Sequence, residues 1–124
     1  MIQMETKLEI MDNSGAKKIK CIKVLKSSRK KKGKLNHIII GSIQSVKPNK
    51  KVNKGAVASI LITRTKKNHT RRDGSFIKFS NNSGILLSEK KNSPVATRTF
   101  GPATVELKKN KKLKQVSSIL NRVY

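Results

Sequence analysis

Basic side chains gather on both sides of one sharp turn in the chain. Asp73-Gly74 predicts a hairpin with a type I′ turn, which needs positive φ at both central residues. The flanking segment, 64–80, carries one sign of charge almost throughout. Its cations are Arg64, Lys66, Lys67, Arg71, Arg72 and Lys78. Lysine makes point-charge contacts with phosphates and arginine makes forked ones. We interpret the hairpin as an arm that lies along phosphates, because a two-stranded ribbon alone in water is marginally stable.

Further basic clusters are spread along the whole chain. They comprise Lys17, Lys18, Lys20 and Lys23 and the segments 28–34, 47–54 and 108–114. This distribution suits a globular body that nucleic acid surrounds on several sides, and it does not suit an enzyme with a basic tail. The second-rank candidates for phosphate contact are Lys17, Lys18, Lys50, Lys51 and Arg98.

The charge balance indicates the class of partner. Thirty Lys and Arg residues face six Asp and Glu residues in 124 positions, which gives a formal net charge of +24. Such a charge destabilises a compact chain unless counter-charge is near, and nucleic acid is the densest source of it. A solvated basic face and an anionic membrane surface are the alternatives. With three Phe, one Tyr and no Trp, we expect contact with the backbone and shape of structured RNA more than with its bases.

The residues that enzymes and metal sites require are missing from the sequence pattern. His37 and His69 are the two histidines, and neither has a second ligand at zinc spacing. The glycines form no phosphate-binding loop motif, and the six acids include no pair suited to acid–base catalysis. We therefore expect no enzymatic activity, metal, cofactor or small-molecule substrate. A histidine-based ribonuclease remains a formal rival.

Hydrophobic patterning predicts a mainly β protein. Alternating or β-branched apolar runs predict strands over 4–10, 19–25, 38–46, 57–63, 75–79 and 84–87, with a bulge near Cys21-Ile22. Short strands separated by turn residues favour a small barrel or sandwich. A short helix is predicted over 103–107, after Pro102. Apolar residues at helical spacing between Leu113 and Val123 predict a helix face that packs on the barrel.

Composition also bears on where the protein works. No stretch is long and apolar enough for a membrane span, and the first residues match no targeting pattern. Cys21, the one cysteine, lies among apolar residues and is interpreted as buried filler.

The 24 Lys, 13 Ile and 10 Asn are residues with A/T-rich codons. This bias suggests an AT-rich genome such as that of an organelle.

Three blocks of residues, in order and covering almost the whole chain, resemble the universal large-subunit ribosomal protein fourteen family in its bacterial and organellar form. The first block is Asp12-Asn13-Ser14-Gly15-Ala16 with Cys21-Ile22-Lys23-Val24-Leu25. The second is Arg64-Thr65-Lys66-Lys67 with Asp73-Gly74-Ser75, Phe79 and Asn82. The third is Thr97-Arg98-Thr99-Phe100-Gly101-Pro102 with Glu106-Leu107.

The resemblance implies one barrel domain over 1–124, made of a five-stranded barrel, a protruding ribbon over about 64–80 and short C-terminal helices over about 103–124. It implies a structural protein that binds large-subunit rRNA at the subunit interface. Its implied partners are neighbouring large-subunit proteins and small-subunit rRNA, which it meets in intersubunit bridges. In related systems a ribosome-silencing factor can occupy this interface, near residues that match Thr97 and Arg98. Glu106 is expected to pair with an arginine such as Arg98 or to be a helix-surface charge.

Departures from the family pattern raise the positive charge further. Asn36-His37 and Gly55-Ala56 stand where the family usually has Gly-Asp, Asn121-Arg122 stands for Pro-Glu, and Arg72 replaces a proline. Together with the composition they favour a divergent, mitochondrial ribosome and an organelle-encoded protein, with plastid or bacterial cytoplasm as alternatives. The rival from another class is a free nucleic-acid-binding module, such as a chromatin-type barrel that also binds DNA.

Overall fold

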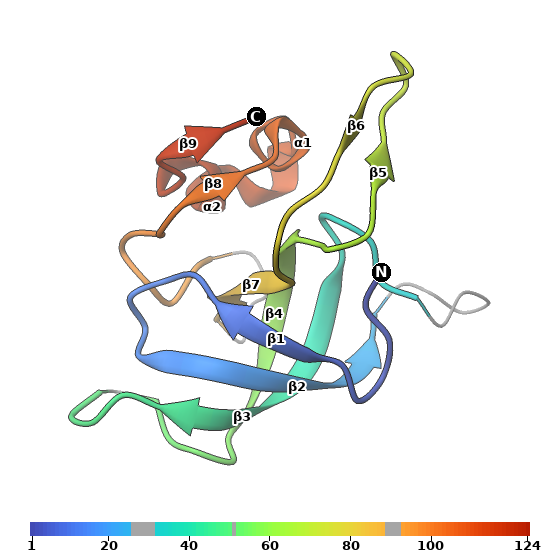
Figure 1. Cartoon of the computed structure of the whole chain (residues 1–124). Helices are drawn as coiled ribbons and strands as arrows, with labels where there is room; N and C mark the ends of the chain where they lie inside the picture. The colour runs from blue at the N-terminus through green and yellow to red at the C-terminus, as the bar shows by residue number, and fades with distance from the viewer. Residues whose placement is uncertain (26–31, 51, 89–92) are drawn as a thin grey trace.

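Five strands close into a barrel in the computed structural model, which describes residues 1–25, 32–50, 52–88 and 93–124 (Figure 1). The barrel strands are β1 (Lys7–Ile10), β2 (Ala16–Val24), β3 (Ile38–Val46), β4 (Val57–Arg64) and β7 (Ser83–Leu87). Their order around the barrel is β1-β2-β3-β4-β7. Neighbouring strands are antiparallel except at the closure, where β1 runs parallel to β7. The prediction of a mainly β, five-stranded barrel is confirmed.

Branched aliphatic side chains fill the barrel interior. Ile19 and Cys21 of β2, Ile39 and Ile43 of β3 and Ile60 of β4 are at most 1% exposed and pack together. The interpretation of Cys21 as buried filler is therefore confirmed, and burial raises the pKa of its thiol, with a smaller contribution from Glu5. The predicted bulge is also present, since the β2–β3 register shifts between Cys21 and Lys23.

A second core lies outside the barrel wall, under the C-terminal residues. Successive residues of β4 face opposite cores: Ile60 faces the barrel interior, whereas Leu61 packs with Ile85, Leu107 and Val116. The unbroken apolar run of β4 is explained by this burial on both faces.

The C-terminal elements are β8 (Pro102–Ala103), α1 (Val105–Lys108), a 3₁₀ turn (Lys111–Leu113), α2 (Lys114–Ser118) and β9 (Arg122–Val123).

Several predicted elements are shorter than the hydrophobic pattern suggested, including the strand over 75–79, which spans only Phe76–Ile77. The first strand begins at Lys7 instead of Met4, because Glu5 takes a φ of 68° and Gln3 N donates to Thr6 Oγ1 in a turn. The C-terminal helix stops at Ser118, because residues 122–123 form a parallel pair with β8. Its apolar face packs on the barrel as predicted, through Leu113 and Val116. None of the helices in the described ranges is long and apolar enough to cross a membrane.

A two-stranded ribbon projects from the barrel between β4 and β7 (Figure 1). Its strands are β5 (His69–Thr70) and β6 (Phe76–Ile77), which pair His69 with Ile77 and Thr70 with Phe76. Ile77 packs against the barrel core. Because side chains alternate between the faces of a strand, Phe76 lies on the opposite, outer face. The ribbon thus has one face toward the body of the protein and one toward solvent.

Candidate nucleic-acid interface

The ribbon turns through three residues, Arg72, Asp73 and Gly74, and not through the predicted type I′ turn. Gly74 has a φ of 82°, whereas Asp73 does not take a positive φ. Arg71 N donates to Ser75 O over 2.8 Å, and Gly74 N donates to Arg71 O over 3.3 Å. This pattern is that of a type I turn followed by a glycine bulge. Ser75 donates to Asp73 Oδ1 through its amide and its hydroxyl, and these bonds lower the pKa of Asp73.

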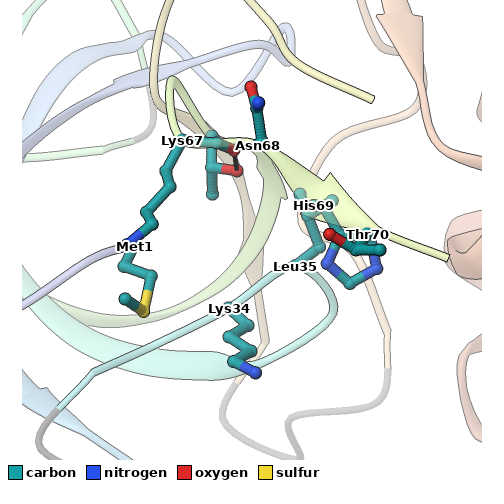
Figure 2. A pocket seen from close by; sticks show the side chains of 8 residues that line it. Met1, Lys34, Leu35, Lys67, Asn68, His69 and Thr70 are labelled. Atoms are coloured by element: carbon teal, nitrogen blue, oxygen red, sulfur yellow. Dashed lines mark hydrogen bonds between the residues drawn. The ribbon is translucent and has the colours of Figure 1, made fainter. Parts of the chain in front are cut away.

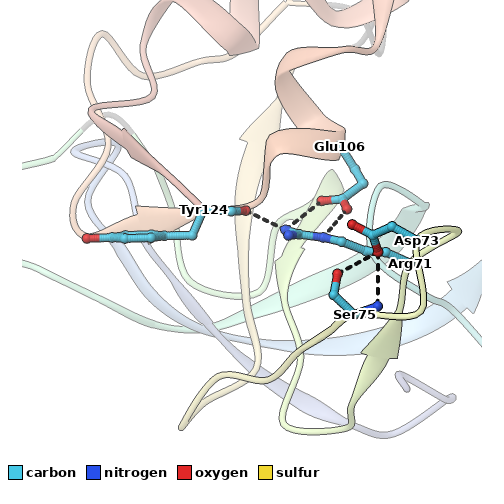
Figure 3. A network of polar contacts seen from close by, with 5 residues as sticks. All are labelled: Arg71, Asp73, Ser75, Glu106 and Tyr124. Atoms are coloured by element: carbon cyan, nitrogen blue, oxygen red, sulfur yellow. Dashed lines mark hydrogen bonds and ion pairs between the residues drawn. The ribbon is translucent and has the colours of Figure 1, made fainter.

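The guanidinium of Arg71 points inward, toward the C-terminal elements (Figure 3). Its Nε donates to Glu106 Oε1 over 2.6 Å, and its Nη2 donates to Tyr124 O over 2.6 Å. For Glu106, the sequence predicts either a pair with an arginine such as Arg98 or a helix-surface charge. In the structure Glu106 pairs with Arg71, because the ribbon lies next to α1. Arg71 is thus placed to hold the ribbon rather than to meet a ligand.

Arg64 is also turned inward. Its Nε donates to Pro102 O and its Nη2 to Phe100 O, each over 2.6 Å. The segment passes so close that a Cβ on Gly101 would lie 2.5 Å from Arg64 Nη2. Burial lowers the pKa of Arg64, while the charge of Glu9 raises it. This guanidinium therefore joins the C-terminal segment to β4, and the donors of Arg64 and Arg71 are directed into the protein.

The remaining ribbon cations face solvent. Lys66, Lys67, Arg72 and Lys78 are all exposed. Within the described part of the chain, the ion pairs are Lys20–Glu5 and Arg71–Glu106, so these four cations have no acidic partner there. The backbone of Lys66 is held in place, because its amide donates to Asn82 Oδ1 over 2.8 Å. The ribbon therefore presents uncompensated positive charge on a fixed support.

A hollow of about 320 Å³ at the base of the ribbon adds to this basic surface (Figure 2). Lys34, Lys67 and His69 line it, and none of its lining residues is acidic. Close by, His37 Nδ1 accepts from the amide of Lys34. Burial and the charge of Lys34 lower the pKa of His37. The positive potential of the ribbon thus continues onto the neighbouring barrel surface.

Other predicted residues form a separate surface around Phe100. Lys17, Lys18 and Lys47 line a hollow of about 270 Å³ with this ring, and the acids Glu9 and Asp12 line it as well. The guanidinium carbon of Arg98 lies 5.7 Å from the ring centroid, a cation–π contact. Thr97 and Arg98 are exposed. The second-rank candidates Lys17, Lys18 and Arg98 therefore lie on a Phe100 surface that is separate from the ribbon surface.

Asn13 fixes the loop that carries Thr97 and Arg98. Its Nδ2 donates to Thr97 Oγ1 over 2.9 Å, and its Oδ1 accepts from Thr97 N over 3.1 Å. In the sequence, Asn13 stands out only as part of the first block of the family resemblance, because no local signal connects it to a segment more than eighty residues away. Lys50 is exposed, and its stem lies against Gly15. Lys51 and part of the basic segment 28–34 lie outside the described residues.

In the described ranges, no three His, Cys, Asp or Glu side chains come together in a group that could hold a metal ion. What distinguishes the molecule is a closed barrel with basic surfaces. The sequence matches the family Ribosomal protein L14p/L23e over residues 1–123. The chain belongs to this family.

Membership in the L14p/L23e family makes the chain a structural protein of the large ribosomal subunit, a class without enzymatic function. It also gives the ribosome as the place where the protein works. The match spans the ribbon, the barrel and the C-terminal elements alike. The resemblance inferred from the three sequence blocks is thereby confirmed at the level of the family.

Proposed function

We propose that this protein is held in the large subunit by electrostatic contact between its ribbon and large-subunit rRNA. The observation that carries the proposal is the exposure of Lys66, Lys67, Arg72 and Lys78, without acidic partners in the described ranges, on a ribbon anchored by Arg71. Each such cation releases condensed counterions when it meets a phosphate. The anchored ribbon reduces the conformational entropy that binding would otherwise cost.

The Phe100 surface is proposed as the part that approaches small-subunit rRNA in intersubunit bridges. Lys17, Lys18 and Arg98 give it positive charge, and Asn13 holds the Thr97–Arg98 backbone in place. Thr97 and Arg98 are also the proposed contacts for a ribosome-silencing factor. Lys50 and Lys51 are proposed as additional rRNA contacts, and neighbouring large-subunit proteins are proposed to dock on the barrel.

The proposed home is a mitochondrial ribosome. The support is compositional: 24 Lys against 6 Arg, with many Ile and Asn, as A/T-rich codons would produce. Plastid and bacterial ribosomes are the alternatives. Locating the gene, together with fractionating organelles and probing for the protein, distinguishes the three.

Charge reversal on the outer ribbon tests the rRNA contact. The variant Arg72→Glu with Lys78→Glu should enter large subunits poorly in a sucrose gradient while the isolated protein stays folded by circular dichroism. The matched control, Lys7→Glu with Lys23→Glu, has the same change in net charge at exposed positions on β1 and β2. Equal incorporation of the ribbon variant and the wild type would reject the ribbon as a principal contact.

A further inference from the structure

Phe76 is the large apolar side chain most exposed to solvent in the described part of the chain. It is 69% exposed, more than Val57 at 65% or Met4 at 61%. Its cross-strand partner Thr70 is exposed as well. The neighbouring pair, His69 and Ile77, lies on the inner face, where Ile77 packs against the barrel core. The exposure of Phe76 therefore follows from the ribbon register and is not a result of fraying.

A single exposed apolar residue is common on protein surfaces, so the surroundings of Phe76 decide its interpretation. Lys78 lies two residues further along the chain and is exposed, as Phe76 is. Arg72 is exposed in the turn that joins the two strands. The acid nearest to them, Asp73, accepts two hydrogen bonds from Ser75. An aromatic ring flanked by cations is complementary to a partner with both negative charge and flat apolar faces.

Unpaired RNA has both properties. Its phosphates match the cations, and its splayed bases stack on aromatic side chains. Residues two apart on a strand are separated by about 6–7 Å, so the ring and Lys78 can engage neighbouring parts of one nucleotide strand. The sequence composition alone suggested contact with backbone and shape, and the exposed ring adds a means of contacting a base.

We propose that Phe76 stacks on an unpaired base of large-subunit rRNA while Lys78 and Arg72 contact the adjoining phosphates. This inference rests on the proposed binding of the ribbon to rRNA. Through Phe76 the ribbon would recognise an unstacked nucleotide, in addition to binding phosphates through its positive charge. Helical rRNA without an extruded base would not satisfy this site.

Side-chain replacement separates stacking from ordinary apolar packing. Phe76→Leu keeps an apolar side chain but removes the ring, whereas Phe76→Tyr and Phe76→Trp keep a ring. Binding of the full chain to large-subunit rRNA should weaken about 5- to 100-fold in Phe76→Leu and should be close to wild type in the aromatic variants. Phe76 lies outside the barrel strands, so all three variants should retain the wild-type circular dichroism spectrum.

Tryptophan fluorescence gives a direct readout of the contact. The natural chain has no Trp, so Phe76→Trp introduces one reporter, and stacking on a base should quench its emission when large-subunit rRNA is added. Val57→Trp is the matched control, because Val57 is 65% exposed at the start of β4, on the barrel. Its emission should change much less than that of Phe76→Trp.

The possible outcomes separate this inference from the proposed function. Wild-type affinity in Phe76→Leu together with unquenched Phe76→Trp would overturn stacking, even if Arg72→Glu with Lys78→Glu still weakened binding. Replacement of Phe76 by photoreactive p-benzoylphenylalanine in assembled subunits should yield a crosslink to rRNA. A crosslink to a neighbouring protein would overturn the inference in favour of a protein partner. Failure of the wild-type chain to bind rRNA at all would instead reject the proposed function.

Discussion

Arg71 of the ribbon and Glu106 of α1 form an ion pair across thirty-five positions of sequence, with Nε and Oε1 2.6 Å apart (Figure 3). The same guanidinium donates to the backbone oxygen of Tyr124. One side chain thus joins the ribbon, α1 and the C-terminal residue that follows β9. Between the ribbon and α1 lies a groove of about 850 Å³ that the two partners help to line. The position of the ribbon relative to the barrel therefore depends on this pair.

Removing either partner should loosen the ribbon. Both side chains are about three-quarters buried, with exposed fractions of 26% for Arg71 and 30% for Glu106. We expect Arg71→Ala and Glu106→Gln each to cost about 1 kcal/mol of unfolding free energy, and the double variant to cost less than the sum. Denaturant unfolding of the four proteins measures this coupling. Strictly additive effects would show that the pair contributes no interaction energy.

Acid should weaken the same contact. Burial alone would raise the pKa of Glu106, but hydrogen bonds from its own amide and from Arg71, with the charges of Arg71 and His69, lower it overall. The carboxylate is therefore favoured in the folded state. Its stabilising effect is complete above the ordinary pKa of glutamate and is lost as the pH falls through the lower, folded-state pKa.

Thermal unfolding from neutral to acidic pH tests this dependence. The wild type should lose more stability than Glu106→Gln over the acid range, because the amide does not titrate. His37, whose pKa burial and Lys34 lower, is present in both proteins and cancels in the comparison. Parallel pH profiles for the two proteins would show that ionisation of Glu106 does not contribute to the stability of the fold.

At Gly84, β7 passes close to β4. A Cβ at this position would lie 2.5 Å from Ile60 Cγ2 and 2.8 Å from Leu61 O. Overpacking of this kind costs about 1–3 kcal/mol, so Gly84→Ala should lower the unfolding free energy by that amount. A cavity-making change in the barrel core, Ile60→Val, is the comparison, at about 0.5–1.5 kcal/mol. Wild-type stability in Gly84→Ala would mean that β4 and β7 separate readily.

Salt dependence should count the phosphate contacts of the ribbon. The logarithm of affinity for nucleic acid falls linearly with the logarithm of salt concentration, with a slope of about 0.7–0.9 per contact. Arg72→Ala with Lys78→Ala should therefore reduce the slope for large-subunit rRNA by about 1.4–1.8. Lys7→Ala with Lys23→Ala is the control at exposed positions on the barrel. An unchanged slope in the ribbon variant would mean that these cations do not meet phosphates.

The sequence predicted the barrel well because local pattern and burial agree there. The β-branched run of β3 and the apolar run of β4 gave strands whose bounds match the structure closely. Asn36, in place of the usual glycine, still takes a φ of 66°, because asparagine tolerates the left-handed region. The turn at 36–37 therefore survives this departure from the family pattern.

Contacts between segments far apart in the sequence could not be predicted from local residue patterns. Arg64 and Arg71 look like any other ribbon cation in the sequence, and only the folded chain shows their donors turned toward Pro102, Phe100, Glu106 and Tyr124. Similarly, helical spacing continued to Val123, yet pairing with β8 ends the helix at Ser118. At the C-terminus, the hydrogen bonds of this strand pair outweighed the local helical periodicity.

Sedimentation of the native protein from a gentle lysate, with and without ribonuclease, tests most directly whether rRNA holds this chain in the large subunit. We predict co-migration with the large subunit in the untreated lysate. Extensive RNA digestion should release the protein to the position of free, slowly sedimenting chains. A pool that already sediments as free protein before digestion, or that follows DNA instead, would contradict the ribosomal role and favour a free nucleic-acid-binding module.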